Sequence, residues 1–388
     1  MRKFKFLIIL LALSVYFFVF SANAFAATYY VSTAGSDSNP CDSSRPCATF
    51  NHAIRNVMRG GDTLMIRDGT YNQPIGYFNQ NSAWSSYSPP NGSSSAYTII
   101  KAENDGKAII EDSYIHIGGP NGVPAGSSYI QVEGLKLRRS YIDIRGSHHI
   151  KILRTGIKNP APINAQYGPS GIGTTCDSHH ILLEDVWVLG AMRYGISIFE
   201  SSNVILRRVV ARFDGNSERE PKAGINFYGQ TSSGSGCHGP FITGAFDSIC
   251  QNCIMIDYNP INMTSGSGLG GGLNEPWAAK NIKLYGTLAL NIPSSGFGLH
   301  GGYGGSNGSG NDIINSVAWN LSGCGLVFID GDPARNIIFN QTTFGRTGGS
   351  GICEFGSVAN NLDIQANAKN SIFYATGGAN MAVHPLPD

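Results

Sequence analysis

The densest cluster of charged residues in the chain lies at 214–222 and has the sequence Asp-Gly-Asn-Ser-Glu-Arg-Glu-Pro-Lys. Asp214, Glu218 and Glu220 carry the hard oxygen ligands that Ca²⁺ prefers, and Lys222 offers a base. Cleavage of a uronate glycan by β-elimination needs both parts, because a base must remove the C5 proton while a cation neutralises the carboxylate. The cluster therefore predicts a Ca²⁺ site beside a catalytic lysine. The alternative is a solvated loop whose charges only keep it exposed.

A second group of polar residues occupies the outward positions of short strands that begin with a Gly-apolar pair. With Ile or Leu pointing inward, the outward ladder is predicted to be Ser197, Asn226, Asn274 and His300. The aromatic and basic neighbours of this ladder are Phe199, Tyr228, Arg193 and Tyr194. Hydroxyls, amides and aromatic rings along a groove provide the hydrogen bonds and stacking faces that sugars need, and a histidine can act as acid or base near neutral pH.

These patterns assign roles to individual residues. The predicted substrate-binding residues are Tyr194, Asn226, Tyr228 and Asn274, and the predicted catalytic residues are Arg193, Lys222 and His300. An ordinary polar face of the fold is the alternative. Glu200 and Glu220 form a weaker candidate for the carboxylate pair of a glycoside hydrolase.

Two histidine pairs, His148-His149 and His179-His180, lie in turns one repeat apart. Four imidazoles at such a spacing could bind a metal ion. No Asp or Glu adjoins either pair, so stacking of the rings in the turns is the favoured alternative.

The elements that must position these residues repeat along the chain. Ser-His-His-Ile at 147–150 returns at 178–181 and then as Ser-Ser-Asn-Val at 201–204. The apolar anchors are Ile150, Ile181, Val204, Ile282, Ile313, Ile337 and Leu362, which are separated by 31, 23, 78, 31, 24 and 25 residues. Coils of this length made of short strands with period 2 predict an all-β fold, a parallel β-helix whose coils stack on one another. A β-sandwich is the alternative, but it would show hairpin turns rather than self-similarity.

The beginning of the chain predicts a secretory signal over 1–26. Arg2, Lys3 and Lys5 precede an apolar run over 6–20, and Ala24-Phe25-Ala26 supplies a cleavage site. An uncleaved anchor is the alternative, although 15 apolar residues are short for a bilayer. Secretion predicts disulfides among the eight cysteines.

Cys41 and Cys47 are expected to pair across a Pro-containing turn. Cys250 and Cys253 form a local bridge or have separate partners. A bridge between Cys324 and Cys353 is conceivable, because they occupy near-equivalent points of neighbouring repeats, and the pairing of Cys176 and Cys237 stays open.

The residues before the repeats carry a resemblance to a known family. The motifs are Tyr29-Tyr30-Val31-Ser32, Gly35-Ser36-Asp37, Pro46-Cys47-Ala48-Thr49-Phe50, Gly61-Asp62-Thr63 and Asp68-Gly69-Thr70-Tyr71. This stretch resembles the opening of the right-handed parallel β-helix superfamily with the pectate-lyase-like fold. The resemblance implies an opening strand, a capping helix and a first coil, and it agrees with a helical apolar face over 47–58.

Members of this family include polysaccharide lyases, glycoside hydrolases and epimerases that act on acidic glycans, and also adhesins and tailspikes. The signature motifs of polygalacturonases and of alginate epimerases are absent from the sequence. The resemblance therefore implies an architecture and a polysaccharide partner, with a non-catalytic surface or adhesive protein as the rival interpretation.

Composition bounds the function and the domain organisation. The 388 residues include 50 Gly, only 14% are charged, and the net charge is +1. This balance excludes a typical nucleic-acid-binding protein, and the 41% hydrophobic content excludes a charge-rich disordered chain. Cleavage of the signal would remove three of the 27 basic residues and leave 24 against 26 acidic residues, a net charge of −2. We expect a cap with the first coil over 27–71, β-helix coils over 72–376, a tail over 377–388, and no membrane contact after cleavage.

Overall fold

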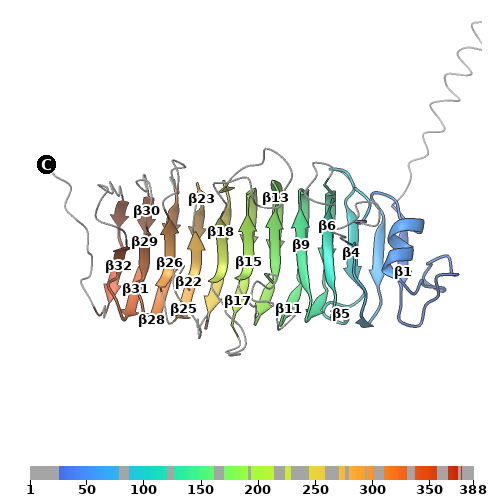
Figure 1. Cartoon of the computed structure of the whole chain (residues 1–388), viewed down its shortest axis with the longest axis horizontal. Coiled ribbons are helices and arrows are strands. Elements are labelled where there is room, and N and C mark those ends of the chain that lie inside the picture. The colour runs from blue at the N-terminus through green and yellow to red at the C-terminus, as the bar shows by residue number, and fades with distance from the viewer. Residues whose placement is uncertain are drawn as a thin grey trace, which may run out of the picture.

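A computed structural model describes residues 26–77, 87–119, 126–160, 170–190, 194–213, 223–228, 244–257, 271–275, 279–292, 295–300, 310–329, 337–355, 366–374 and 377. Their strands form three long sheets, A, B and C, in which neighbouring strands are parallel. Figure 1 shows the strands stacked along one long axis, from β1 at the blue end to β32 at the red end. From β4 to β18 each coil contributes one strand to each sheet in the order A, B, C, so the chain winds into the predicted parallel β-helix.

The strand bounds follow the coils. Sheet A contains β1 (Thr28–Val31), β2 (Thr63–Ile66), β4 (Thr98–Ala102), β7 (Ser128–Glu133), β10 (His148–Leu153), β13 (Ser178–Glu184), β16 (Ser201–Arg207), β19 (Ala245–Phe246), β20 (Ile249–Gln251), β23 (Ala279–Lys280), β24 (Lys283–Tyr285), β27 (Asp312–Ile314), β30 (Ile337–Asn340) and β33 (Ala366–Lys369). Sheet B contains β3 (Gly69–Tyr71), β5 (Ala108–Glu111), β8 (Lys136–Arg138), β11 (Gly156–Lys158), β14 (Trp187–Leu189), β17 (Val210–Arg212), β21 (Ile254–Ile256), β25 (Leu288–Ile292), β28 (Val317–Leu321), β31 (Thr343–Thr347) and β34 (Ile372–Tyr374). Sheet C contains β6 (Tyr114–Gly118), β9 (Tyr141–Arg145), β12 (Ile172–Thr175), β15 (Tyr194–Phe199), β18 (Ala223–Tyr228), β22 (Gly271–Glu275), β26 (Ser295–His300), β29 (Leu326–Ile329) and β32 (Ile352–Phe355).

Stacked apolar ladders hold the coils together. In sheet C the residues Ile142, Ile172, Ile196 and Ile225 stand in register, and each has no solvent-exposed area. Burial of one such side chain stabilises the fold by about 1.5–3 kcal/mol. Side chains alternate between the two faces along a strand. The residues next to each isoleucine on its own strand therefore point away from the core and form the outward face of the sheet.

A short helix covers the end of the stack at β1 (Figure 1). It comprises the α-helical turn α2 (Phe50–His52) and a π-helical turn η1 (Ala53–Val57), and is therefore shorter than the predicted 47–58. Thr49 begins it, because its side chain accepts a hydrogen bond from the backbone N–H of His52 at 3.1 Å. Phe50 is fully buried and contacts the ring of Tyr71, with the two ring centroids 5.2 Å apart, so the helix closes the apolar interior.

The register refines the repeat pattern in the second half of the chain. The 78-residue gap between Val204 and Ile282 holds two coils, because β20 is the strand between β16 and β24 in sheet A. The anchor Ile313 pairs with Leu284, not with Ile282. The position beside Ile282 belongs to Asn311, which is buried and accepts a hydrogen bond from the Ile282 N–H at 2.8 Å. Leu362 lies outside the described residues.

Disulfides join Cys41 to Cys47, as predicted, and Cys250 to Cys253, which is the local alternative for that pair. Cys176 and Cys324 each take part in a disulfide as well. Within the described ranges, no helix has the length and apolar character needed to cross a bilayer.

Candidate functional site

Five of the predicted site residues lie on segments that lead directly into sheet C. Arg193 immediately precedes β15, and Lys222 immediately precedes β18. Asp214, Glu218 and Glu220 lie on the same connection as Lys222, between β17 and β18. All five fall outside the described residues, so the predicted base and Ca²⁺ ligands stay predictions.

Three of the predicted ladder residues share one row across the outward face of sheet C. Ser197 stands in register with Asn226, and Asn226 with Asn274. Asn274 then pairs with Gly298, and His300 lies two residues further along β26. The reason is that Gly296-Phe297, rather than Gly298-Leu299, occupies the Gly-apolar position in this coil. By backbone register His300 therefore belongs to the column of Phe199 and Tyr228, not to the row of Asn226.

Asn226 is fully buried, although it belongs to this outward row. Within the described part of the chain, neither its Oδ1 nor its Nδ2 has a hydrogen-bond partner. Leaving such a group unpaired costs about 1–3 kcal/mol, so a bound molecule that hydrogen-bonds to this amide would recover free energy. Tyr228 packs nearby against Phe199, with ring centroids 4.5 Å apart, and lies 5.7 Å from Tyr194.

The row continues toward the N-terminus through residues that the sequence analysis missed. Ser197 pairs with Gly173, Gly173 with Asp143, and Asp143 with His116. We call the line from His116 through Asp143, Gly173, Ser197 and Asn226 to Asn274 the outward row. A signal was available in the sequence, because Tyr-Ile-His-Ile at 114–117 recurs as Tyr-Ile-Asp-Ile at 141–144.

Asp143 is the centre of a charged cluster at this end of the outward row. Its Oδ2 accepts hydrogen bonds from His116 Nδ1 at 3.1 Å and from Arg145 Nε at 2.8 Å. The His116 side chain is 1% exposed, that of Asp143 18% and that of Arg145 30%. Burial alone would raise the pKa of Asp143, but the His116 hydrogen bond and the Arg145 charge outweigh it, and the pKa lies below its usual value. Asp143 is therefore ionised at neutral pH, and its carboxylate accepts the hydrogen bond that the Nδ1–H of His116 donates.

Two stacked tyrosines flank this charged cluster. The rings of Tyr114 and Tyr141 have centroids 5.6 Å apart and planes 23° apart. Burial, followed by the negative charge of Asp143, raises the pKa of Tyr141 to about 12. Both rings are partly exposed, so they offer an apolar face beside the guanidinium that Asp143 holds.

Gly173 leaves a gap in the outward row between Asp143 and Ser197. No described atom lies within 4 Å of the place that a Cβ at this position would take. Gly173 is also partly exposed. The gap is therefore bordered in the row by the carboxylate of Asp143 and the hydroxyl of Ser197, with the amide of Asn226 one strand further on and the Arg145 guanidinium held by Asp143.

A second cluster lies in sheet A, where the two predicted histidine pairs stack. The rings of His148 and His179 have centroids 5.1 Å apart and planes 6° apart, and those of His149 and His180 are 4.8 Å and 7° apart. Burial, followed by the neighbouring histidines His180 and His148, lowers the pKa of His149. Burial, followed by His148 and His180, likewise lowers the pKa of His179. The rings therefore stack as predicted, but within the strands β10 and β13 rather than in turns, and metal binding by these histidines stays a prediction.

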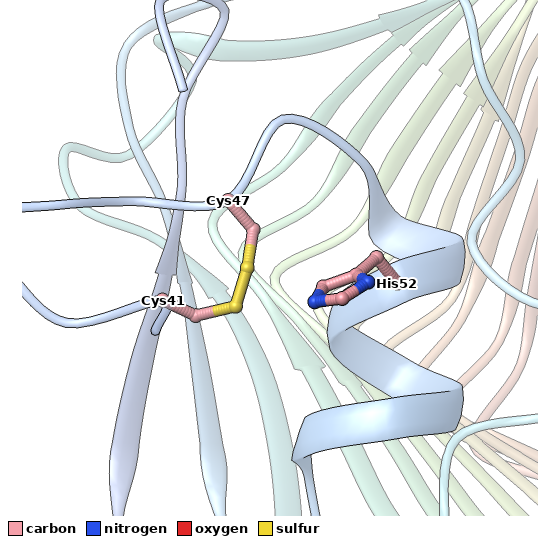
Figure 2. Close-up of side chains that lie close together, drawn as sticks. All are labelled: Cys41, Cys47 and His52. Carbon is pink, nitrogen blue, oxygen red and sulfur yellow. A yellow bond between two sulfur atoms is a disulfide. The ribbon is translucent and has the colours of Figure 1, made fainter. Parts of the chain in front are cut away.

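A third group, Cys41, Cys47 and His52, lies beside the capping helix (Figure 2). Ligand atoms of the three residues all lie within 4.8 Å of one another. Both sulfurs are joined in the Cys41–Cys47 disulfide, however, and a metal ligand needs a thiolate. His52 Nδ1 lies 3.2 Å from Asn56 Nδ2. The group is a packed disulfide and carries no metal chemistry in this oxidised form.

No family model and no curated protein sequence matches the chain, whereas solved structures match its fold. Pectate lyase Pel9A superposes with a TM-score of 0.54 at 16% identity, over 90% of this chain and 80% of that enzyme. The alginate lyase AlyGC of family PL6 gives a TM-score of 0.52 at 11% identity, over 79% of this chain and 39% of that one. PfbA, a surface adhesin of Streptococcus pneumoniae, gives 0.50 at 12% identity, over 85% of both chains.

These matches show the architecture. The chain has the right-handed parallel β-helix of pectate-lyase-like proteins, with a capping helix at the N-terminal end. At identities this low the likeness concerns the fold alone, so function must be argued from the outward face of sheet C.

Proposed function

We propose that this protein is secreted and binds an extended polysaccharide along the outward row of sheet C. The observation that carries the proposal is the Gly173 gap, bordered by the Asp143–Arg145 pair on one side and by Ser197 on the other. Arg145 is held by Asp143, so its guanidinium is oriented before a ligand arrives, and the donors of an arginine suit carboxylates and hydroxyls. A polymer along the solenoid axis meets an equivalent position in each coil, about every 4.8 Å.

The stacked pair Tyr114–Tyr141 supports a sugar ligand in particular. Partly exposed aromatic rings beside hydrogen-bonding groups provide both kinds of contact that a pyranose ring uses, its apolar face and its hydroxyls. Asn226 adds an amide whose two polar atoms lack partners among the described residues. The proposed binding surface thus extends over the coils from β6 to β18.

A catalytic form of the proposal adds β-elimination on a uronate-containing glycan. Lys222 would remove the C5 proton, with Ca²⁺ held by Asp214, Glu218 and Glu220, and with Arg193 and His300 as further catalytic groups. The lyase proposal is supported by the position of Lys222 immediately before β18 and by Arg145, which lies in the same sheet C as β18. In addition, two of the proteins with a similar fold are lyases. The adhesin PfbA has a similar fold as well, and it supports the non-catalytic rival.

The experiment combines binding and turnover on the same polymers. The protein is run in gels that contain polygalacturonate, alginate or dextran, and each polymer is also incubated with it, with and without EDTA, while the ultraviolet absorbance of an unsaturated product is followed. The variants are Lys222→Ala and, as a matched control in an exposed turn remote from sheet C, Lys107→Ala. Product that disappears with EDTA and in Lys222→Ala but persists in Lys107→Ala supports the lyase. Retardation without product supports the non-catalytic rival, and absence of retardation in every gel overturns the proposal.

Secretion is tested separately, by N-terminal sequencing of protein recovered from the culture medium or periplasm. A chain that begins after Ala26, or after Ala24 of the neighbouring Ala22-Asn23-Ala24 motif, agrees with a cleaved signal. An intact Met1 in the membrane fraction contradicts it.

A further inference from the structure

We propose that the stacked histidines of sheet A form a binding site for a divalent late transition-metal ion, with each histidine pair acting as a chelate. In one coil the Nδ1 atoms of His148 and His149 lie 2.8 Å apart. In the next coil the Nδ1 atoms of His179 and His180 lie 2.7 Å apart. The same chelate is thus built twice, from the repeated sequence Ser-His-His-Ile.

The spacing within each pair brings two nitrogens within reach of one ion. Two nitrogens bound at about 2.0 Å to one ion lie about 2.8 Å apart at right angles and roughly 3.3 Å apart in a tetrahedral site. The observed 2.8 and 2.7 Å are the lengths of the hydrogen bonds that join the ion-free rings, so small ring movements reach either geometry. Among these divalent ions Cu²⁺ binds imidazole sites most strongly, which makes it the probe of choice.

The backbone holds the two rings of each pair close together before an ion arrives. His149 and His180 have φ of 56° and 54°, in the left-handed region, and this turns each of them toward the histidine that precedes it. The backbones of the two coils pair in register, His148 with His179. Tyr129 of the preceding coil is level with His149, and its ring stacks on His149 with centroids 4.6 Å apart. The rings therefore have little freedom to lose on binding an ion.

Ion binding requires only local rearrangement and leaves the charge of the imidazoles unchanged. In a neutral pair, the Nδ1–H of one ring donates a hydrogen bond to the Nδ1 of the other ring. When an ion binds, that proton transfers through solvent to the Nε2 of the same ring, and both Nδ1 lone pairs turn onto the ion. His148 and His149 are partly exposed, as is His179, while His180 is exposed, so solvent reaches the site.

The ion lies within a coil and does not bridge two coils. Rings of successive coils are parallel within 6° and 7°, so their lone pairs run side by side and do not converge. Two ions bound one coil apart would repel each other strongly. Coulomb's law at about 5 Å in water predicts that the second ion binds on the order of a hundredfold more weakly at low salt.

The test compares two double variants that each remove two histidines. His148→Gln with His149→Gln removes one chelate and leaves the other whole. His149→Gln with His180→Gln breaks both chelates and leaves two single histidines. His52→Gln serves as the control for loss of a histidine outside the cluster. The untagged, oxidised full-length protein is titrated with Cu²⁺ by calorimetry, bound Cu²⁺ is examined by electron paramagnetic resonance, and circular dichroism confirms that each variant is folded.

We expect one tightly bound Cu²⁺ with nitrogen hyperfine coupling in the wild type, in His52→Gln and in the variant that removes one pair. The variant that breaks both pairs should bind at least tenfold more weakly. Equal weakening in the two double variants would overturn the chelate. So would unchanged binding in both, or a spectrum without nitrogen coupling. If a double variant is unfolded, the matching single variants His149→Gln and His148→Gln replace it, and each must then leave one tight ion.

Discussion

Asp143 and His116 stand directly opposite each other in neighbouring coils and are joined by a hydrogen bond of 3.1 Å. The bond lies on the outward face of sheet C, yet the His116 side chain is 1% exposed. Arg145 approaches the same carboxylate oxygen from Asp143's own strand. One carboxylate thus links two coils and orients the cation on the proposed binding surface.

Asp143→Ala should destabilise the protein more than the loss of a surface ion pair does. Removing the carboxylate leaves the buried His116 without this partner, and loss of a buried hydrogen bond to a charged group costs about 1.5–3 kcal/mol. The matched control is Asp105→Ala, which breaks the Asp105–Arg154 pair of 2.7 Å between side chains that are 53% and 48% exposed. Exposed pairs contribute about 0–1 kcal/mol. The denaturation midpoints of both variants in urea provide the comparison, and an equal loss in the two would contradict the role of Asp143.

Gly173→Val should separate stability from ligand binding. No described atom obstructs a side chain at this position, and replacing a strand glycine by a residue of high β-propensity gains about 0.5–1 kcal/mol. The new side chain fills the gap of the outward row, so affinity for the bound polysaccharide should fall at least tenfold.

Gly173→Ala is the graded control, with a smaller effect on affinity. Gel retardation and thermal melting report the two quantities independently. A valine variant that is stable and binds normally would place the ligand elsewhere on the molecule.

The fold could be predicted because each coil repeats the same pattern of buried apolar positions. Ile150, Ile181 and Val204 recur in the sequence at the positions that pair in the sheet, so periodicity along the chain translates into neighbours in space. His300 shows where this reasoning ends. A shift of two residues keeps every side chain on its face, and both Gly296-Phe297 and Gly298-Leu299 satisfy the pattern. Only the pairing of β22 with β26 distinguishes them.

The Asp143 cluster escaped prediction for a different reason. Each of its residues is a single polar residue within a strand of alternating apolar and polar positions. His116 and Asp143 are 27 residues apart in the sequence, and only the stacking of the coils brings them together.

Charged residues at matching positions of successive coils show how the coils tolerate charge. Like charges would repel in a ladder, but Arg208 pairs with Asp185 and Arg139 with Asp112. Opposite charges in successive coils therefore make a charged corner stable.

Tyr141 predicts a loss of stability in alkaline solution. Its pKa is raised from 10.0 to about 12 by burial and by Asp143, so the native state holds the phenol proton more tightly than the unfolded chain does. This contribution is complete below pH 10 and is lost as the pH rises through 12. Burial likewise raises the pKa of Tyr71 to about 12, so Tyr71 adds a further loss of stability as the pH rises.

Thermal melting between pH 8 and pH 12 checks this prediction. Tyr141→Phe should flatten the alkaline fall in melting temperature, whereas Tyr374→Phe, at a residue that is 59% exposed, should leave it unchanged. An identical alkaline fall in Tyr141→Phe and the wild type would contradict the burial of this phenol.

The asparagine column near the ends of the sheet B strands β25 and β28 offers a test of how the left-handed backbone positions are held. Asn320 has φ of 58°, and its Nδ2 donates to Oδ1 of Asn291 in the preceding coil at 2.9 Å. Asn291 in turn donates to Asp257 at 3.2 Å. Asn320→Gly keeps the left-handed backbone and loses only the side-chain bond, which costs about 0.5–1.5 kcal/mol. Asn320→Ala loses the bond and also strains the backbone by a further ~1–2 kcal/mol. Denaturation midpoints should therefore fall in the order wild type, glycine, alanine, and an alanine variant at least as stable as the glycine variant would show that backbone conformation does not select asparagine here.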